Sequence, residues 1–123
     1  ALLIGARGVL RVAFTTGASL KPVATHEPPT ERTYYWIGRS GDFDGDGIPD
    51  LAMIDRRLPG LQILAGSKTG IRRALAMPVF ETRPSESPDN EPRALATGDL
   101  DGDGRCDLVL IAHDRILIYL QDK

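Results

Sequence analysis

The chain has a single cysteine, Cys106, so it cannot form an internal disulfide. Its longest apolar runs fall far short of the roughly 18 consecutive residues that a membrane-spanning helix needs. The stretch from Ala1 to Phe14 does not have the form of a signal peptide, because Arg7 and Arg11 interrupt its apolar region. We therefore expect no disulfide framework, no membrane span and no targeting segment in this sequence.

Catalytic signatures are also missing. The sequence contains no nucleophile elbow, no zinc-protease helix motif and no phosphate-binding loop. The two histidines, His26 and His113, stand in a Pro-rich connection and in an expected hairpin turn, and the sequence implies a partner for neither. The arginines are scattered, without the interleaved aromatic residues of a nucleic-acid platform. We therefore expect neither an enzyme nor a nucleic-acid-binding protein.

The chain contains one acidic motif that occurs twice. The segment 42–50 reads D-x-D-G-D-G-x-x-D, and the same pattern returns at 99–107. Each copy follows a glycine and runs into a leucine and an apolar stretch. Two unit charges about 4 Å apart interact by about 1 kcal/mol in water and about 4 kcal/mol near a protein surface. Four carboxylates in one loop would therefore repel one another strongly unless a cation lay among them.

The spacing predicts which groups would bind that cation. Side chains at loop positions 1, 3, 5 and 9 can converge on one point, position 7 offers its carbonyl, and position 6, Gly47 or Gly104, allows a sharp turn. Oxygen ligands in a flexible loop favour Ca²⁺ over Mg²⁺. The expected ligands of two calcium sites are Asp42, Asp44, Asp46 and Asp50 with the carbonyl of Ile48, and Asp99, Asp101, Asp103 and Asp107 with the carbonyl of Arg105. The alternative is a solvated acidic turn that binds no metal.

An EF-hand loop begins in the same way but fits poorly. It needs a bidentate Glu at position 12 and a helix on each side. Position 12 is Met53 in the first copy and Leu110 in the second. The stretch 114–120 is rich in β-formers, which predicts a strand where an EF-hand would need a helix.

The two loops belong to a larger repeat with a period of about 50 to 60 residues. A hydrophobic run leads into each loop, and an apolar run, a short polar turn and a second apolar run follow it. The start of the chain repeats this scheme without a loop. The expected strands are 2–6, 9–14, 34–38, 51–54, 61–66, 94–98, 108–112 and 116–120. Such a period, with about four strand signals in it, predicts an all-β fold of propeller blades.

The two loops with their flanking strands resemble a known family. The pattern Gly-Asp-x-Asp-Gly-Asp-Gly-x-x-Asp-Leu, starting at Gly41 and at Gly98, is similar to the FG-GAP or VCBS repeat. That repeat builds the β-propeller of integrin α-subunits and of many secreted bacterial proteins, and its loop holds Ca²⁺ between the first two strands of a blade. The resemblance implies four-stranded antiparallel blades. It divides the chain into a partial blade at 1–32 without its inner strand and calcium loop, a complete blade at 33–92 and a partial blade at 93–123.

A propeller has about four to eight blades, so about two and a half are too few to close one. End units leave apolar faces open, and we expect them to pack against further propeller blades or other protein chains, as part of a longer polypeptide or as an assembling subunit. The expected function is a calcium-stabilised structural or protein-interaction module. The alternative is the non-catalytic part of a propeller enzyme or lectin acting on polysaccharide, with carbohydrate as its ligand.

The sequence also carries signals about location, the aromatic cluster and the long connections. Weak calcium sites with dissociation constants of about 10⁻⁴ to 10⁻³ M suit an extracytoplasmic location, namely the periplasm, the cell surface or the medium. Alternation along a strand places Tyr34 and Trp36 on one face and Tyr35 and Ile37 on the other, where packing between blades is favoured over sugar stacking. The connections 15–32 and 81–93 are rich in Pro, Ser, Thr and Glu and are predicted to be surface loops.

Overall fold

The computed structural model describes residues 2–5, 8–14, 19–28, 30–57, 60–79 and 92–122. Over these ranges the protein is all-β, as the sequence predicts. None of the described residues belongs to a helix that could span a membrane. The strands in chain order are β1 (Leu2–Gly5), β2 (Gly8–Phe14), β3 (Leu20–His26), β4 (Tyr35–Gly41), β5 (Asp50–Asp55), β6 (Gly60–Gly66), β7 (Ile71–Pro78), β8 (Ala94–Gly98), β9 (Asp107–Ala112) and β10 (Arg115–Tyr119).

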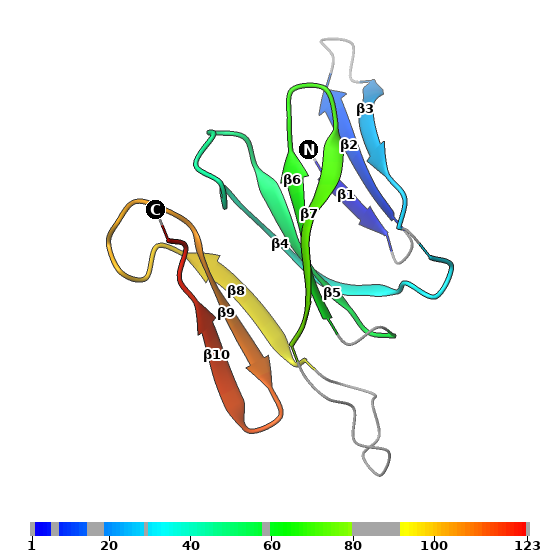
Figure 1. Ribbon diagram of the computed structural model, residues 1–123. Coiled ribbons are helices and arrows are strands. Elements are labelled where there is room, and N and C mark those ends of the chain that lie inside the picture. The colour runs from blue at the N-terminus through cyan, green and yellow to red at the C-terminus, as the bar shows by residue number, and fades with distance from the viewer. Residues whose placement is uncertain are drawn as a thin grey trace.

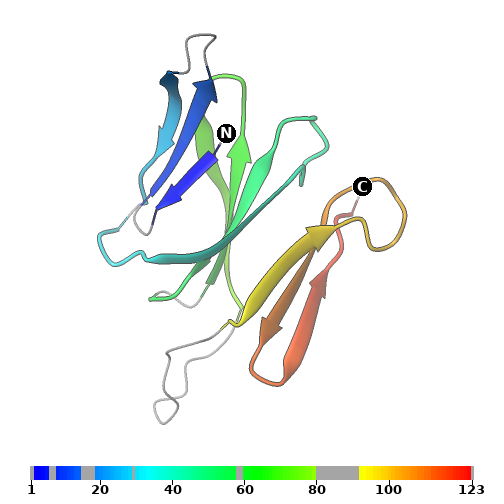
Figure 2. The ribbon, with the colours of Figure 1, turned by 180° about the vertical axis from the view of Figure 1, so that it is seen from behind.

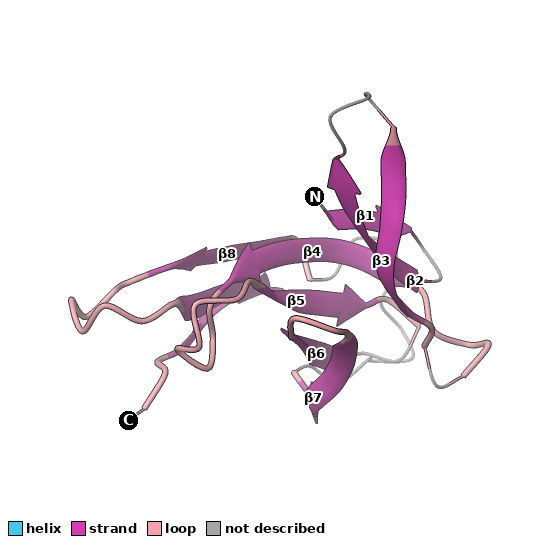
Figure 3. Cartoon of the chain, turned by 90° about the horizontal axis from the view of Figure 1, so that it is seen from above, coloured by secondary structure: helices cyan, strands magenta, loops and turns pink. Residues whose placement is uncertain are grey.

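The strands form three antiparallel sheets, each made of consecutive strands (Figure 1). The first sheet has the order β1-β2-β3, the second β4-β5-β6-β7 and the third β8-β9-β10. Strands β4 and β8 lie side by side at the junction of the second and third sheets, where the Thr97 hydroxyl donates a hydrogen bond to the carbonyl of Ser40 at 3.1 Å. The view from behind and the view from above show the first and third sheets on opposite sides of the second (Figures 2 and 3).

The hydrophobic core is divided between the two faces of the second sheet. On one face, residues of β5 and β6 pack against the third sheet; the buried members of this cluster are Phe43, Ala52, Ile54, Leu61, Ile63, Leu95, Leu108 and Leu110. On the other face, Leu51, Met53 and Leu64 pack with Tyr35 and with Val9 of the first sheet. Because successive side chains of a strand point to opposite faces and both faces are covered, β5 is buried at every position. This explains its continuous apolar run.

Strand β3 lies where a loop was predicted. The segment Leu20–His26 falls within the connection 15–32, so that prediction is wrong for these residues. Most side chains of β3 are exposed, which removes the hydrophobic pattern of a strand. Pro22 is tolerated because proline is confined to edge strands, and β3 is an edge of the first sheet. Most of the other predicted loop, 81–93, lies outside the described residues.

The alternation predicted around Trp36 is also wrong. The pairing of β4 with β5 shifts register between Tyr35 and Ile37, as at a β-bulge. Tyr35 consequently joins the cluster facing the first sheet, whereas Ile37 packs against the cluster facing the third. A bulge inserts one extra residue and breaks the two-residue period, which is why alternation fails here.

Candidate metal centres

The two acidic segments occupy equivalent places in their sheets. Residues 42–50, which we call loop 1, join β4 to β5, and residues 99–107, loop 2, join β8 to β9. The glycines at positions 4 and 6 of both loops have left-handed backbones, with φ of 77° and 79° at Gly45 and Gly47, and of 80° and 85° at Gly102 and Gly104. Residues without a Cβ adopt this conformation at little cost, so the glycines of the motif determine the turn.

The first aspartate of each loop binds the backbone of the turn. Asp42 accepts hydrogen bonds from the amides of Gly45 and Gly47, both at 2.8 Å. In loop 2, Asp99 accepts the equivalent bonds from Gly102 at 2.7 Å and Gly104 at 2.9 Å. The two loops therefore share one hydrogen-bonded conformation, and in each of them these bonds orient the carboxylate at position 1.

The last aspartate anchors each loop to its sheet. Asp50 is 1% exposed and accepts hydrogen bonds from the amide of Phe43 at 2.9 Å and from that of Gly66, the last residue of β6, at 2.7 Å. Asp107 is equally buried. It accepts equivalent bonds from the amide of Leu100 at 2.8 Å and that of Gln121, just beyond β10, at 2.9 Å. Each of these carboxylates closes its loop and ties it to the end of the third strand of its sheet, at Gly66 of β6 or at Gln121 just beyond β10.

The electrostatic balance differs between these two anchors. Burial raises the pKa of Asp50, and the charges of Asp44 and Asp42 contribute in the same direction. At Asp107 the hydrogen bond from the Gln121 amide is the largest effect and lowers the pKa. A cation bound in either loop would favour the charged form of its carboxylates.

Three carboxylates converge in each loop. The converging groups are Asp42, Asp44 and Asp50 in loop 1, and Asp99, Asp101 and Asp107 in loop 2. Within each group, one oxygen of every residue lies within 4.8 Å of the others. Oxygens that bind one Ca²⁺ at about 2.3 to 2.6 Å lie at most about twice that distance apart. Each cluster could therefore hold a metal ion.

Position 5 lies outside these clusters. Asp46 is exposed, and its Oδ1 accepts a hydrogen bond from the amide of Ile48 at 2.7 Å. The Asp103 carboxylate accepts the same bond from the amide of Arg105 at 2.9 Å. The structure thus brings together the predicted side chains at positions 1, 3 and 9, and it engages the position 5 side chains with the backbone of position 7.

Loop 2 carries a cationic side chain that loop 1 lacks. The Nε atom of Arg105 lies 3.9 Å from an oxygen of Asp103, and the guanidinium also donates to the carbonyl of Asp122 at 2.7 Å. The equivalent residue of loop 1 is the apolar Ile48. A guanidinium near the carboxylates partly neutralises loop 2, although an ion pair this exposed contributes only about 0 to 1 kcal/mol.

A polar network between the first two sheets is not evident in the sequence. The Tyr35 hydroxyl donates to the side-chain oxygen of Gln62 at 3.2 Å, and Nε2 of His26 lies 3.2 Å from the same hydroxyl. Burial, with a smaller effect from the charge of Arg73, lowers the pKa of His26. Nothing in the sequence indicates this contact, because 15–32 is predicted to be a loop. His26 lies beside Tyr35 only because it belongs to strand β3.

The fold and the loops together define a class: an all-β protein of antiparallel sheets with two acidic loops that could each hold a metal ion. Comparison of the chain with protein-family models, with curated proteins and with solved structures finds no match.

Proposed function

We propose that the chain is a segment of a calcium-stabilised β-propeller of the FG-GAP or VCBS type, acting as a structural or protein-interaction module outside the cytoplasm. One observation carries this proposal. Two loops with the same hydrogen-bond pattern each gather three carboxylates. In both cases the loop joins the first two strands of a sheet, which is where the resemblance implies a calcium loop.

The arrangement of the sheets supports the blade assignment. The second sheet has four antiparallel strands, as a complete blade would. The first strands of the second and third sheets, β4 and β8, lie next to each other, as the inner strands of neighbouring blades would. Apolar side chains of the second sheet pack against both neighbours, so each sheet covers a face that the next one could not bury alone.

The chemistry of the loops favours calcium among metal ions. Their side-chain donors are carboxylates, which suit hard cations, and Ca²⁺ accepts more oxygens in less regular geometry than Mg²⁺ does. The backbone amides that bind Asp42 and Asp99 hold these carboxylates in place before any ion arrives. The ion would neutralise the repulsion among the converging carboxylates and thereby stabilise the loops.

Two aromatic side chains disfavour the carbohydrate-binding alternative. The guanidinium of Arg56 lies 4.8 Å above the ring of Trp36, and that of Arg57 lies 5.5 Å above the ring of Tyr34. Trp36 is 45% exposed, but one face of its ring already stacks on a cation. A sugar would therefore have to displace an arginine to stack on that face.

Calorimetric titration of the metal-free chain with calcium tests the proposal. We expect two bound ions, with weaker calcium binding at one site in Asp44→Asn and at the other site in Asp101→Asn, and weaker binding of magnesium at both sites. Asp114→Asn is the control, because this carboxylate lies outside both loops, is 89% exposed and forms an exposed ion pair with Arg115 at 3.7 Å. Absence of binding at millimolar calcium, or equal effects of all three substitutions, would reject the calcium sites.

A further inference from the structure

The two acidic loops differ in charge at one position. Loop 1 contains four carboxylates and no basic residue, whereas loop 2 contains four carboxylates and Arg105 at position 7, where loop 1 has Ile48. The formal charge is therefore −4 in loop 1 and −3 in loop 2. Both residues at position 7 are half-buried, and the backbone carbonyl of each is among the ligands that the sequence predicts.

The side chains at position 7 lie against the same part of each sheet. Gly66 and Gln121 are equivalent, because their amides bind the last aspartate of loop 1 and of loop 2, respectively. Cγ2 of Ile48 lies 3.2 Å from the place that a Cβ on Gly66 would take. The guanidinium of Arg105 donates to the carbonyl of Asp122, the residue after Gln121, at 2.7 Å. A cationic side chain in loop 2 thus takes the place of an apolar one in loop 1.

Arg105 pairs with a carboxylate whose counterpart in loop 1 has no cationic partner. In both loops, one oxygen of the position 5 carboxylate accepts a hydrogen bond from the amide of position 7, at 2.7 Å in loop 1 and 2.9 Å in loop 2. The other oxygen of Asp103 lies 3.9 Å from Nε of Arg105. Asp46, its counterpart, forms no ion pair within the part of the chain that the structure describes. A metal ion could therefore recruit Asp46 as a further ligand without breaking an ion pair, whereas Asp103 would have to leave Arg105.

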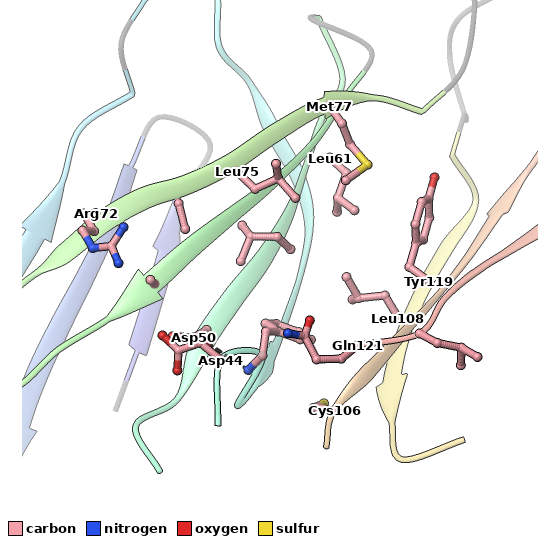
Figure 4. A pocket seen from close by; sticks show the side chains of 15 residues that line it. Asp44, Asp50, Leu61, Arg72, Leu75, Met77, Cys106, Leu108, Tyr119 and Gln121 are labelled. Atoms are coloured by element: carbon pink, nitrogen blue, oxygen red, sulfur yellow. Dashed lines mark hydrogen bonds between the residues drawn. The ribbon is translucent and has the colours of Figure 1, made fainter. Parts of the chain in front are cut away.

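Two other arginines lie near loop 1 without pairing with it. Arg11 of β2 donates to the carbonyl of Ser67, just beyond β6, at 2.5 Å. Arg72 of β7 lines a pocket together with Asp44 and Asp50, and Figure 4 shows its guanidinium apart from these carboxylates. Neither arginine forms an ion pair with loop 1 among the described residues. The contrast between the loops at position 7 is therefore not cancelled by a second ion pair.

On the basis of the calcium sites proposed above, we propose that Arg105 makes them unequal: loop 1 binds calcium more tightly, and loop 2 is the site that responds to higher calcium. The affinity of a calcium loop depends on the charge of its ligands and on the rigidity of the site. The guanidinium of Arg105 repels the incoming cation and competes with it for Asp103, so loop 2 should bind calcium about two- to fivefold more weakly. At calcium concentrations between the two dissociation constants, loop 1 is more than half filled and loop 2 is less than half filled.

Titration of the metal-free, isotopically labelled full chain with calcium chloride, followed by NMR, measures the two sites separately. The amides of Gly47 and Gly104 stand at position 6 and report on loop 1 and on loop 2. We expect the Gly47 amide to reach half of its shift at about two- to fivefold less calcium than the Gly104 amide. Exchange of the residues at position 7 tests the cause. Arg105→Ile should bring the affinity of loop 2 close to that of loop 1, and Ile48→Arg should weaken loop 1 by about two- to fivefold.

Two controls separate the charge of position 7 from its packing and from the net charge of the chain. Arg105→Lys keeps a cation at position 7 and should leave loop 2 the weaker site. Arg115→Ile removes one positive charge outside both loops, where the side chain is 78% exposed and pairs with Asp114. This control should leave the affinities of both loops unchanged.

Equal affinities of the two loops in the unsubstituted chain would overturn the proposal and leave the calcium sites standing. An exchange at position 7 that changes neither affinity would do the same. If Arg105→Lys behaves like Arg105→Ile, then packing and not charge sets the affinity of loop 2, and the proposal is wrong. Absence of calcium binding in both loops would reject the calcium sites themselves, and the difference between them with it.

Discussion

The thiol of Cys106 lies against Gly41, so closely that a Cβ on this glycine would overlap Sγ and touch the ring of Phe43. Gly41 ends β4 just before loop 1, and Cys106 stands at position 8 of loop 2, just before β9. The contact therefore joins the bases of the two acidic loops. Gly98 precedes loop 2 as Gly41 precedes loop 1, yet a Cβ there would meet nothing within 4 Å. Two glycines that are equivalent in the motif thus differ in their surroundings.

This difference predicts opposite results for one substitution at two sites. Gly41→Ala should lower the free energy of unfolding by about 1 to 3 kcal/mol, the usual cost of overpacking a filled site. Gly98→Ala should be neutral or stabilise the chain by about 0.4 to 1 kcal/mol, because it reduces the freedom of the unfolded chain. Urea unfolding of both variants measures the contrast. Equal losses would show that the packing of Cys106 on Gly41 does not constrain this junction.

The sequence predicted the elements that carry strong periodic signals. The apolar runs of β5, β6 and β9 lie where expected, because strands buried on one or both faces need such runs. The run of β10 also lies where expected, although Ile116 and Ile118 in it are exposed. Strand β3 escaped prediction because its side chains are mostly exposed, so no hydrophobic pattern marks it. The bulge beside Trp36 escaped because it depends on the pairing of β4 with β5, which is a tertiary property.

The loops likewise combine features that the sequence predicts with features that depend on how the strands and sheets pair. The glycine positions and the converging aspartates at positions 1, 3 and 9 follow from local spacing, which the repeated motif displays directly. The anchoring of Asp50 by Gly66 could not be predicted, because the two residues meet only when β5 pairs with β6. The packing of Cys106 on Gly41 likewise depends on how two sheets meet. Nothing in one sequence reports that geometry.

Bound calcium should raise the thermal stability of the chain. A ligand that binds only the folded state stabilises it by about 2.7 kcal/mol per site at a hundredfold excess over its dissociation constant. A chelator should therefore lower the melting temperature, and Asp44→Ala or Asp101→Ala should each remove part of that shift. Asp114→Ala, at an exposed turn, should keep the full shift. Identical melting curves with and without chelator would count against structural metal ions.

Acidification should destabilise the junction of the first two sheets through His26. Burial, and to a smaller extent the charge of Arg73, lowers the pKa of His26 in the folded state. The stability that the neutral ring contributes is thus fully present above the unfolded pKa of about 6.5 and is lost as the pH falls through that value towards the folded pKa. Urea midpoints of the metal-free chain between about pH 8 and pH 5 measure this loss.

The matched comparison is His26→Gln against His113→Asn. Glutamine at position 26 does not titrate, so its urea midpoint should change less with pH than that of the unsubstituted chain. His113 stands in the turn between β9 and β10 with a φ of 55°, a conformation that asparagine tolerates. This control should retain the pH dependence of the unsubstituted chain. If both variants follow the unsubstituted chain, then His26 is not the group that titrates.

The substitutions Asp50→Asn and Asp44→Asn should separate the structural role of a loop carboxylate from its role in binding metal. Asp50 is buried and accepts two backbone hydrogen bonds, one from Phe43 and one from Gly66, whereas Asp44 is exposed and accepts one within the loop. In Asp50→Asn the side chain keeps one acceptor oxygen and gains a donor, so one buried amide loses its partner, at a cost of about 1 to 3 kcal/mol. Asp44→Asn keeps its single bond and should change the stability of the metal-free chain by less than about 0.5 kcal/mol.

Both variants should bind calcium more weakly, because each removes a charged oxygen from the same cluster. Urea unfolding in a chelator and calorimetric titration with calcium measure the two effects separately. A metal-free Asp50→Asn chain as stable as Asp44→Asn would show that the bonds from Phe43 and Gly66 do not anchor the loop, and that loop 1 depends on its ion alone.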